Sequence, residues 1–136
     1  MLLNTLKVKN NEALILQTPI STFANAVTPT NTPRTILVSS TNKVVYRLFD
    51  SIISSSYFCA SFPPAAPTVT DEWNAADGVA GTSGIIEVTT TQILNPSTQV
   101  LTGYNHYVVF KNITFSNGVN SFTYEQYVFG NFVTSI

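Results

Sequence analysis

Few side chains in this sequence have the types and spacing that catalysis needs. His106 is the single histidine, so the chain has no second imidazole for a proton relay and no His cluster for zinc. A serine nucleophile would need His106 together with an orienting carboxylate, and the sequence contains no G-x-S-x-G turn. We therefore interpret His106 as a hydrogen-bonded structural residue and expect no acyl-transfer activity.

The acidic residues suggest two other kinds of site. Glu87 and Glu125 could form a carboxylate pair for glycoside hydrolysis, but solvated positions on strand faces explain them equally well. Residues 71–77 carry oxygen ligands suited to Ca²⁺, although their spacing does not match an EF-hand loop and a polar loop also explains them. These candidate calcium ligands are Asp71, Glu72, Asn74 and Asp77. We expect a non-enzymatic protein without a cofactor.

Aromatic residues form a second candidate set. Trp73 is the only tryptophan and lies among acidic and amide side chains. It could be a stacking platform for a ligand, or a hydrophobic plug that fixes its loop to a sheet, and the large area of the indole favours the plug. Most other aromatic residues fall between positions 104 and 132. The candidate sugar-stacking residues are Trp73, Tyr104, Tyr107, Tyr124 and Tyr127.

A C-terminal β-meander over residues 84–133 is predicted to position most of these aromatic side chains. Residues 85–94 alternate apolar with polar side chains, and Asn95-Pro96-Ser97 is a turn signal that ends the strand. Asn117-Gly118 is a dipeptide favoured in two-residue hairpin loops. The three predicted strands are 85–94, 104–115 and 121–134.

Aromatic residues occur at both odd and even positions of the last two predicted strands. One-face burial cannot account for this distribution, because successive side chains of a strand point to opposite faces. Either both faces of the sheet are covered, or a β-bulge changes the parity at Lys111-Asn112 or at Gly130. A third possibility is that part of the aromatic surface is left open for a partner.

The first half of the chain predicts shorter strands. Residues 6–9 and 13–17 read as a hairpin around Asn10-Asn11, with a helix over 11–17 as the alternative. Residues 35–39 and 43–50 also read as a hairpin, followed by a third strand over 52–58. A helix over 44–53 is the alternative there, but β-branched residues favour strand.

Two loops separate these units. Residues 21–33 are rich in Thr, Asn and Pro and predict a surface loop anchored by Phe23. Residues 61–84 predict a longer loop rich in Pro and Gly, with Trp73 in its middle. With 136 residues the chain is long enough for one core. We predict a single all-β domain over residues 1–136, an antiparallel β-sandwich of seven or eight strands with the long loop lying across one sheet.

Composition restricts the partners and the environment. Charged residues make up only 10% of the chain and the net charge is −1, so nucleic-acid binding is not expected. No run of residues is long and apolar enough to predict a transmembrane segment. A surface of Ser, Thr and Asn is typical of exported proteins, virion components and fibrous assemblies. Cys59 is the single cysteine, for which we expect a buried free thiol.

Two stretches carry a resemblance to a known group of proteins. They read NKVVYRLFDSIISSSYFCASFPPAAPTVTDEWNAADG from position 42 and TGYNHYVVFKNITFSNGVNSFTYEQYVFGNF from position 102. They resemble small exported proteins of unknown function, many lipid-anchored, from flavobacteria and related Bacteroidota, and the similarity runs from Asn42 to Phe132, about two-thirds of the chain. The resemblance implies an all-β body and export to the periplasm or cell surface, and it implies no activity. Cys59 follows Ser56-Tyr57-Phe58 rather than a lipobox, so a lipid-bearing cysteine would have to precede Met1.

The leading hypothesis is therefore a non-enzymatic, extracytoplasmic interaction or assembly module whose partner is a protein. A virion or filament subunit is the first alternative, in which an edge strand or residues 2–17 add to the sheet of a neighbouring copy. A carbohydrate-binding module is the second alternative.

Overall fold

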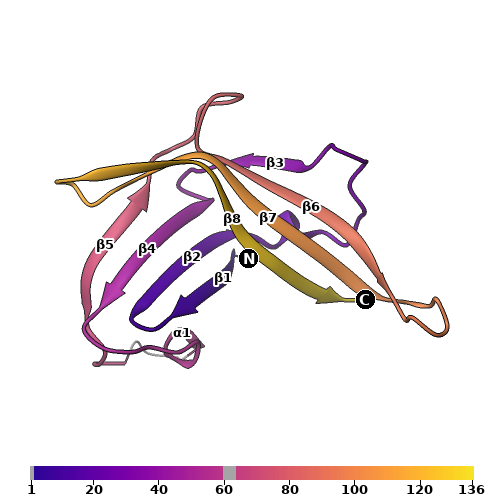
Figure 1. The fold of residues 1–136 in the computed structure, drawn as a ribbon, viewed down its shortest axis with the longest axis horizontal. Helices are drawn as coiled ribbons and strands as arrows, with labels where there is room; N and C mark the ends of the chain where they lie inside the picture. Colours follow the sequence, from indigo (N-terminus) through magenta and orange to yellow (C-terminus); the bar gives the residue numbers. More distant parts are fainter. Residues whose placement is uncertain (1, 60–63) are drawn as a thin grey trace.

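The computed structural model describes residues 2–59 and 64–136 of the chain, and eight of its strands form one antiparallel sheet (Figure 1). The all-β prediction is confirmed. A sandwich of two separate sheets is not confirmed, because hydrogen bonds join all the described strands into one sheet. The strands are β1 (Leu2–Lys9), β2 (Glu12–Pro19), β3 (Arg34–Leu37), β4 (Lys43–Phe49), β5 (Val69–Ala75), β6 (Ile85–Leu94), β7 (Leu101–Ser116) and β8 (Ser121–Ser135).

The sheet bends so that its two halves face each other (Figure 1). Its order is β1-β2-β4-β5-β7-β6-β3, and β8 also pairs with β7. β7 belongs to both halves, since its residues 101–111 pair with β6 while Phe115 and Ser116 pair with β5. The bend also brings β1 close to β8: the Nζ atom of Lys7 lies 3.3 Å from the hydroxyl oxygen of Tyr127.

The predicted C-terminal meander is confirmed, and two local irregularities explain its aromatic residues on both parities. Asn112 has a left-handed φ of 49°. Phe110 precedes it at an even position and Ile113 follows it at an odd position, yet both side chains are completely buried. In β8 the partners of Val108 and Val109 are Gly130 and Val128, so Phe129 is an inserted residue. Gly130 itself has a φ of 134°, which favours glycine. The parity changes at both predicted positions.

The predicted hairpin at the N-terminus is also confirmed. β1 and β2 pair along their whole length, and Asn10 takes the left-handed φ of 54° that its turn requires. The alternative helix over 11–17 is wrong. β2 is buried on both faces, which is why its apolar pattern resembles that of a helix.

Three predictions and one alternative for the middle of the chain are wrong. β3 and β4 are strands, but they do not form a hairpin: β3 pairs with β6, and β4 pairs with β2 and β5. Residues 52–58 are not a strand, and residues 44–53 are not a helix. The predicted loop over 61–84 contains β5, although its positions 61–63 lie outside the described residues. The structure therefore places Trp73 in a strand and not in a loop.

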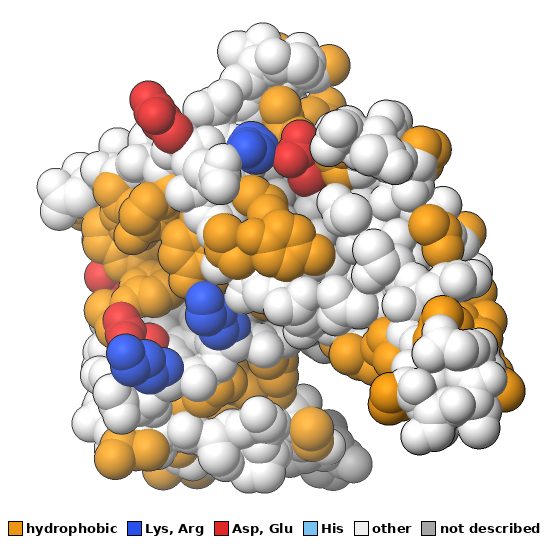
Figure 2. Space-filling view, turned by 45° about the vertical axis from the view of Figure 1, so that its right-hand side comes forward, with side chains coloured by type: hydrophobic (Ala, Val, Ile, Leu, Met, Phe, Trp, Pro, Cys, Tyr) orange, Lys and Arg blue, Asp and Glu red, His pale blue; other side chains and the backbone are white. Residues whose placement is uncertain are grey.

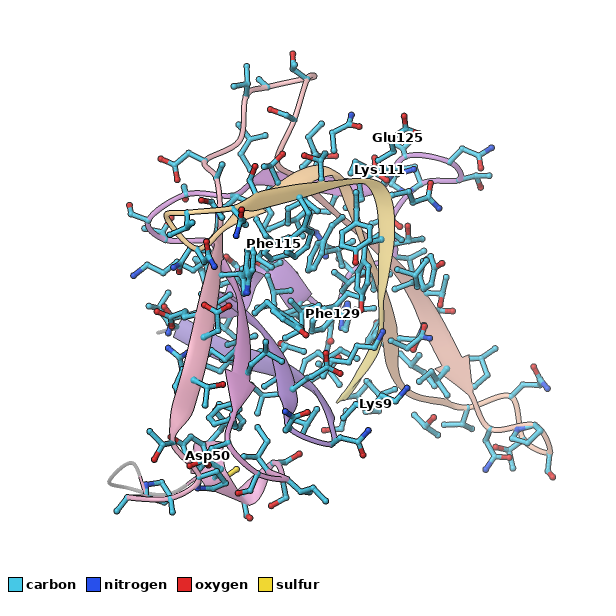
Figure 3. All side chains as sticks on the ribbon, turned by 60° about the vertical axis from the view of Figure 1, so that its left-hand side comes forward. Lys9, Asp50, Lys111, Phe115, Glu125 and Phe129 are labelled. Carbon is cyan, nitrogen blue, oxygen red and sulfur yellow. The ribbon has the colours of Figure 1, made fainter. Side chains whose placement is uncertain are left out.

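Buried side chains form two clusters on opposite faces of the β1-β2-β4 part of the sheet. The larger cluster lies between the two halves of the sheet and includes Phe110, Phe115 and Phe129. Figure 3 shows Phe115 and Phe129 inside this space, with Lys111 and Glu125 on the far side of the β7–β8 hairpin. Phe23 joins it from the short 3-10 helix η1 (Ile20–Phe23) and is 4% exposed, so the predicted anchor of the 21–33 loop is confirmed.

The smaller cluster lies on the outer face, where Phe49 and Ile53 pack beside Ala13 and Ile15. The aromatic rings of Tyr57 and Phe58 cover it from α1 (Ser56–Cys59). No residue of α1 is buried, and Cys59 at its end is exposed, so the prediction of a buried thiol is wrong. Across residues 2–59 and 64–136, neither the length nor the apolar character of any helix suffices to cross a membrane.

Candidate functional site

An apolar cleft of about 420 Å³ is the candidate binding site. It lies between the β1-β2-β4-β5 part of the sheet and the tip of the β7–β8 hairpin. Figure 2 shows hydrophobic side chains gathered over a broad area of one face, with basic and acidic side chains beside them. The cleft is lined by Lys7, Lys9, Glu12, Leu14, Tyr46, Leu48, Trp73, Phe115, Phe122, Tyr124 and Tyr127.

Strand register aligns one wall of the cleft. Directly opposite residues on neighbouring strands point to the same face of a sheet. Lys7 is the partner of Leu14, Leu14 of Tyr46, and Tyr46 of Trp73, so these four residues form one row across four strands. The next row contains Lys9, Glu12 and Leu48. The wall therefore runs from two lysines at the β1 edge to the indole of Trp73.

The β7–β8 hairpin supplies the opposite wall. Phe115 and Phe122 are directly opposite residues on β7 and β8, and their rings stack at a centroid distance of 5.3 Å. The ring of Phe122 also lies 5.0 Å from that of Trp73, at an angle of 55°. Tyr124 is nearly perpendicular to Phe122, at 82°. Apart from the stacked pair of Phe115 and Phe122, the rings are tilted against one another, so they enclose a cleft and do not form a flat platform.

Polar groups at the cleft fix the orientation of two tyrosines. The hydroxyl of Tyr46 donates a hydrogen bond to the Glu12 carboxylate. Burial, this hydrogen bond and the charge of Glu12 all raise the pKa of Tyr46 above its usual range, so Tyr46 remains a neutral donor. The Lys7 ammonium donates to the Tyr127 hydroxyl and lies 5.0 Å from the centroid of its ring.

Three of the five predicted aromatic binding residues meet in this cleft: Trp73, Tyr124 and Tyr127. Tyr104 and Tyr107 do not line it, because they lie in the first half of β7, far along the strand from Phe115. Trp73 is half-buried and packs against the main core, so it both fixes β5 and presents a ring to the cleft. Tyr124 is the most open of the three, at 43% exposure.

The predicted calcium ligands do not converge. Successive residues of a strand point to opposite faces, so β5 directs Asp71 to the side of Trp73, and Glu72 and Asn74 to the other. Glu72 is instead paired with Arg47, at 2.7 Å. Asp77 follows the end of the strand. Within residues 2–59 and 64–136, no three His, Cys, Asp or Glu side chains gather as a metal site would require.

The carboxylates proposed for glycoside hydrolysis are also absent from the cleft. Glu87 and Glu125 lie on β6 and β8, and neither is among the described residues that line it. Glu12 is the one acidic side chain in that lining. The cleft thus offers apolar contact, tyrosine hydroxyls and a few charges, which are groups suited to binding.

His106 occupies a different place, inside the core, with both ring nitrogens hydrogen-bonded. Its Nδ1 atom lies 2.8 Å from the Thr90 hydroxyl, and its Nε2 atom lies 2.9 Å from the Thr134 hydroxyl. Thr134 donates its proton to Asn25, while Thr90 accepts one from Arg34. This pattern assigns the proton of a neutral His106 to Nε2. The interpretation as a structural residue agrees with this geometry.

The stability of the fold is expected to fall as the solution is acidified through the titration range of His106. Burial and the nearby Arg34 charge lower its pKa below the usual 6.5. The unfolded chain therefore takes up the proton first as pH falls, and the stabilisation present above about 6.5 is lost below it. Urea unfolding midpoints measured from neutral pH downwards check this. His106→Gln is the control, and an equally steep fall in that variant would assign the loss to other groups.

Sequence reasoning did not identify several lining residues, among them Lys7, Lys9, Glu12, Tyr46 and Phe122. The pattern that could have identified them is the alternation of side chains between the two faces of a strand. Glu12 and Leu14 lie on the same face of β2, and Tyr46 and Leu48 lie on the same face of β4. That signal becomes useful only when the pairing of β2 with β4, and of β4 with β5, is known.

Comparison of the chain with protein-family models, with characterised proteins and with solved structures gives no significant match. The candidate site therefore rests on the geometry of this chain alone.

Proposed function

We propose that this protein is a non-enzymatic interaction module, exported to the periplasm or the cell surface. In this proposal the aromatic cleft holds an apolar side chain of a partner protein. The single observation that carries it is the convergence of Trp73, Phe122, Tyr124 and Tyr127 in one cleft with Lys7 at its edge.

The physical chemistry of the cleft supports a protein ligand. Trp and Tyr are enriched among the residues that contribute most to binding, because each offers a large, rigid area with a polar group. The volume of about 420 Å³ lies within the range typical of ligand sites and exceeds that of one aromatic side chain. Lys7 and Lys9 outnumber Glu12, which favours an acidic residue beside the apolar anchor.

Composition and resemblance support the proposed environment. A chain with 10% charged residues obtains its polar surface from Ser, Thr and Asn, as many exported proteins do. The resemblance of residues 42–132 to small exported proteins of Bacteroidota supports the same location, in the periplasm or at the cell surface.

A carbohydrate is the second candidate ligand. Aromatic rings stack on the apolar faces of sugars, and Glu12, Tyr46 and Lys7 supply hydrogen-bonding groups beside them. Because the rings are tilted by 52° to 82°, the cleft fits a short sugar better than an extended polysaccharide.

Trp73 makes the proposal testable without a label, since no other tryptophan contributes to fluorescence. We expect saturable changes in its emission on titration with a short peptide that carries one Phe next to Glu. A peptide with Ser in place of Phe is the ligand control, and Tyr107→Ala is the protein control. A response to short oligosaccharides alone would favour the second candidate. No response to either ligand would contradict a binding role for the cleft.

A further inference from the structure

We propose a second interaction site, in which an extended strand of a partner protein enters the space between β1 and β8. This space, here called the seam, is lined by residues 4–7 of β1 and 129–132 of β8 and has a volume of about 340 Å³. The inference goes beyond the proposed function of the cleft, with which the seam shares Lys7.

The seam separates two strand edges that lack a partner strand. β1 pairs only with β2, and β8 pairs only with β7. In the described residues no backbone hydrogen bond joins β1 to β8. An edge strand presents a row of free N–H and C=O groups, which an added strand can satisfy. The two edges therefore offer hydrogen bonds on both sides of an inserted segment.

One of two buried hydroxyl groups without a partner in the described structure, that of Thr5, lies at the seam. Among the described residues, the Oγ1 atoms of Thr5 and Thr18 are buried without a hydrogen-bond partner. Thr5 is 7% exposed and lines the seam, and Thr18 lies on the neighbouring strand β2, opposite Leu3. Leaving a buried hydroxyl unpaired is unfavourable, so most such groups find partners. A Ser, Thr or Asn side chain pointing inward from an added strand would supply one to Thr5.

β8 leaves room for such a strand. Phe129 is the inserted residue of the bulge and turns its ring into the core, at 6% exposure. Gly130 beside it has no side chain, and a Cβ atom built there would meet nothing within 4 Å. The position that a side chain of residue 130 would take is therefore open.

The charge of Lys7 favours a partner strand that carries an acidic side chain. Among the described residues that line the seam, Lys7 alone carries a charge. Its ammonium lies 3.5 Å from the Val128 carbonyl at the end of the seam, where an acidic side chain of the partner would pair with it. The edge strand β1 of a second copy fits less well, because it carries Lys7 and Lys9 and no acidic residue.

Hydrogen exchange of the whole protein tests this proposal with a defined probe. The probe is a short synthetic peptide in which Thr alternates with Val and one Thr is replaced by Glu. We expect it to protect amides of residues 4–7 and 129–132, while peptides with Lys in place of Glu, or with Pro at alternate positions, protect less. Thr5→Val removes the hydroxyl at nearly constant volume and should weaken peptide binding about five-fold, whereas Thr5→Ser should bind as the unchanged protein does.

Other outcomes would overturn the proposal. They are the absence of protection at the seam when the probe is in large excess, protection confined to the cleft, or equal binding by Thr5→Val and Thr5→Ser. Seam protection without peptide that rises with protein concentration, together with larger particles in light scattering, would assign the seam to a second copy and overturn the partner proposal. Thermal unfolding of both Thr5 variants shows whether they fold, and Thr5→Val should be at least as stable as Thr5→Ser, because it removes an unpaired hydroxyl.

Discussion

Replacing Phe110 with Ala is expected to lower the free energy of unfolding by about 3–5 kcal/mol. Phe110 is completely buried in β7, with its ring 5.4 Å from that of Phe129 and stacked near that of Tyr127. It belongs to the buried cluster between the two halves of the bent sheet, together with Leu14 and Leu16 of β2. Because a domain of this size has a total stability of about 5–15 kcal/mol, this single change removes a large part of it.

Tyr107→Ala is the matched control for Phe110→Ala. It removes an aromatic ring from the same strand, but Tyr107 is 38% exposed. Urea unfolding of both variants should show a much smaller loss for Tyr107→Ala. Equal losses would mean that the packing between the two halves does not depend on Phe110, and would contradict the position of the core.

Replacing Trp73 with Ala is expected to weaken binding of the Phe-containing peptide by about 30-fold or more. Truncating a central aromatic residue of an interface commonly costs about 2 kcal/mol or more, which corresponds to this factor. Trp73 closes one end of the residue row that runs across four strands and contacts Phe122 of the opposite wall. Its loss therefore removes contacts to both walls of the cleft. Calorimetry is the measurement, because the variant has no tryptophan fluorescence.

Controls separate loss of the binding surface from loss of the fold. Trp73 also packs against the core, so unfolding curves must show that Trp73→Ala is folded under the binding conditions. Trp73→Phe keeps an aromatic ring and should retain part of the affinity. Tyr124→Ala removes a more exposed ring of the cleft and should also weaken binding. Unchanged affinity in folded Trp73→Ala would place the peptide elsewhere.

Local sequence patterns were sufficient to predict those strands that pair with their neighbours in the chain. β6, β7 and β8 follow one another, and both parity changes occur where Asn112 and Gly130 suggested them. The β1–β2 hairpin has a turn with a residue at positive φ, which Asn tolerates. In each case the residues that determine the structure are close together in the sequence.

Pairings between distant strands could not be predicted in this way. β3 and β4 look like a hairpin because a short polar turn separates them, yet each finds a distant partner. β5 was missed because its polar residues alternate around Trp73 between segments rich in Pro and Gly. The cleft depends on these pairings, since they align Lys7, Tyr46 and Trp73 in one row.

Amide chemical-shift mapping during titration with the Phe-containing peptide is the most direct test of the central claim, that the cleft is the binding site. Shifts are predicted to concentrate on the strands that form its two walls, at residues such as Leu14, Tyr46, Trp73, Phe122 and Tyr127. Shifts confined to the outer face, around Tyr107 or the Arg47–Glu72 pair, would contradict the claim.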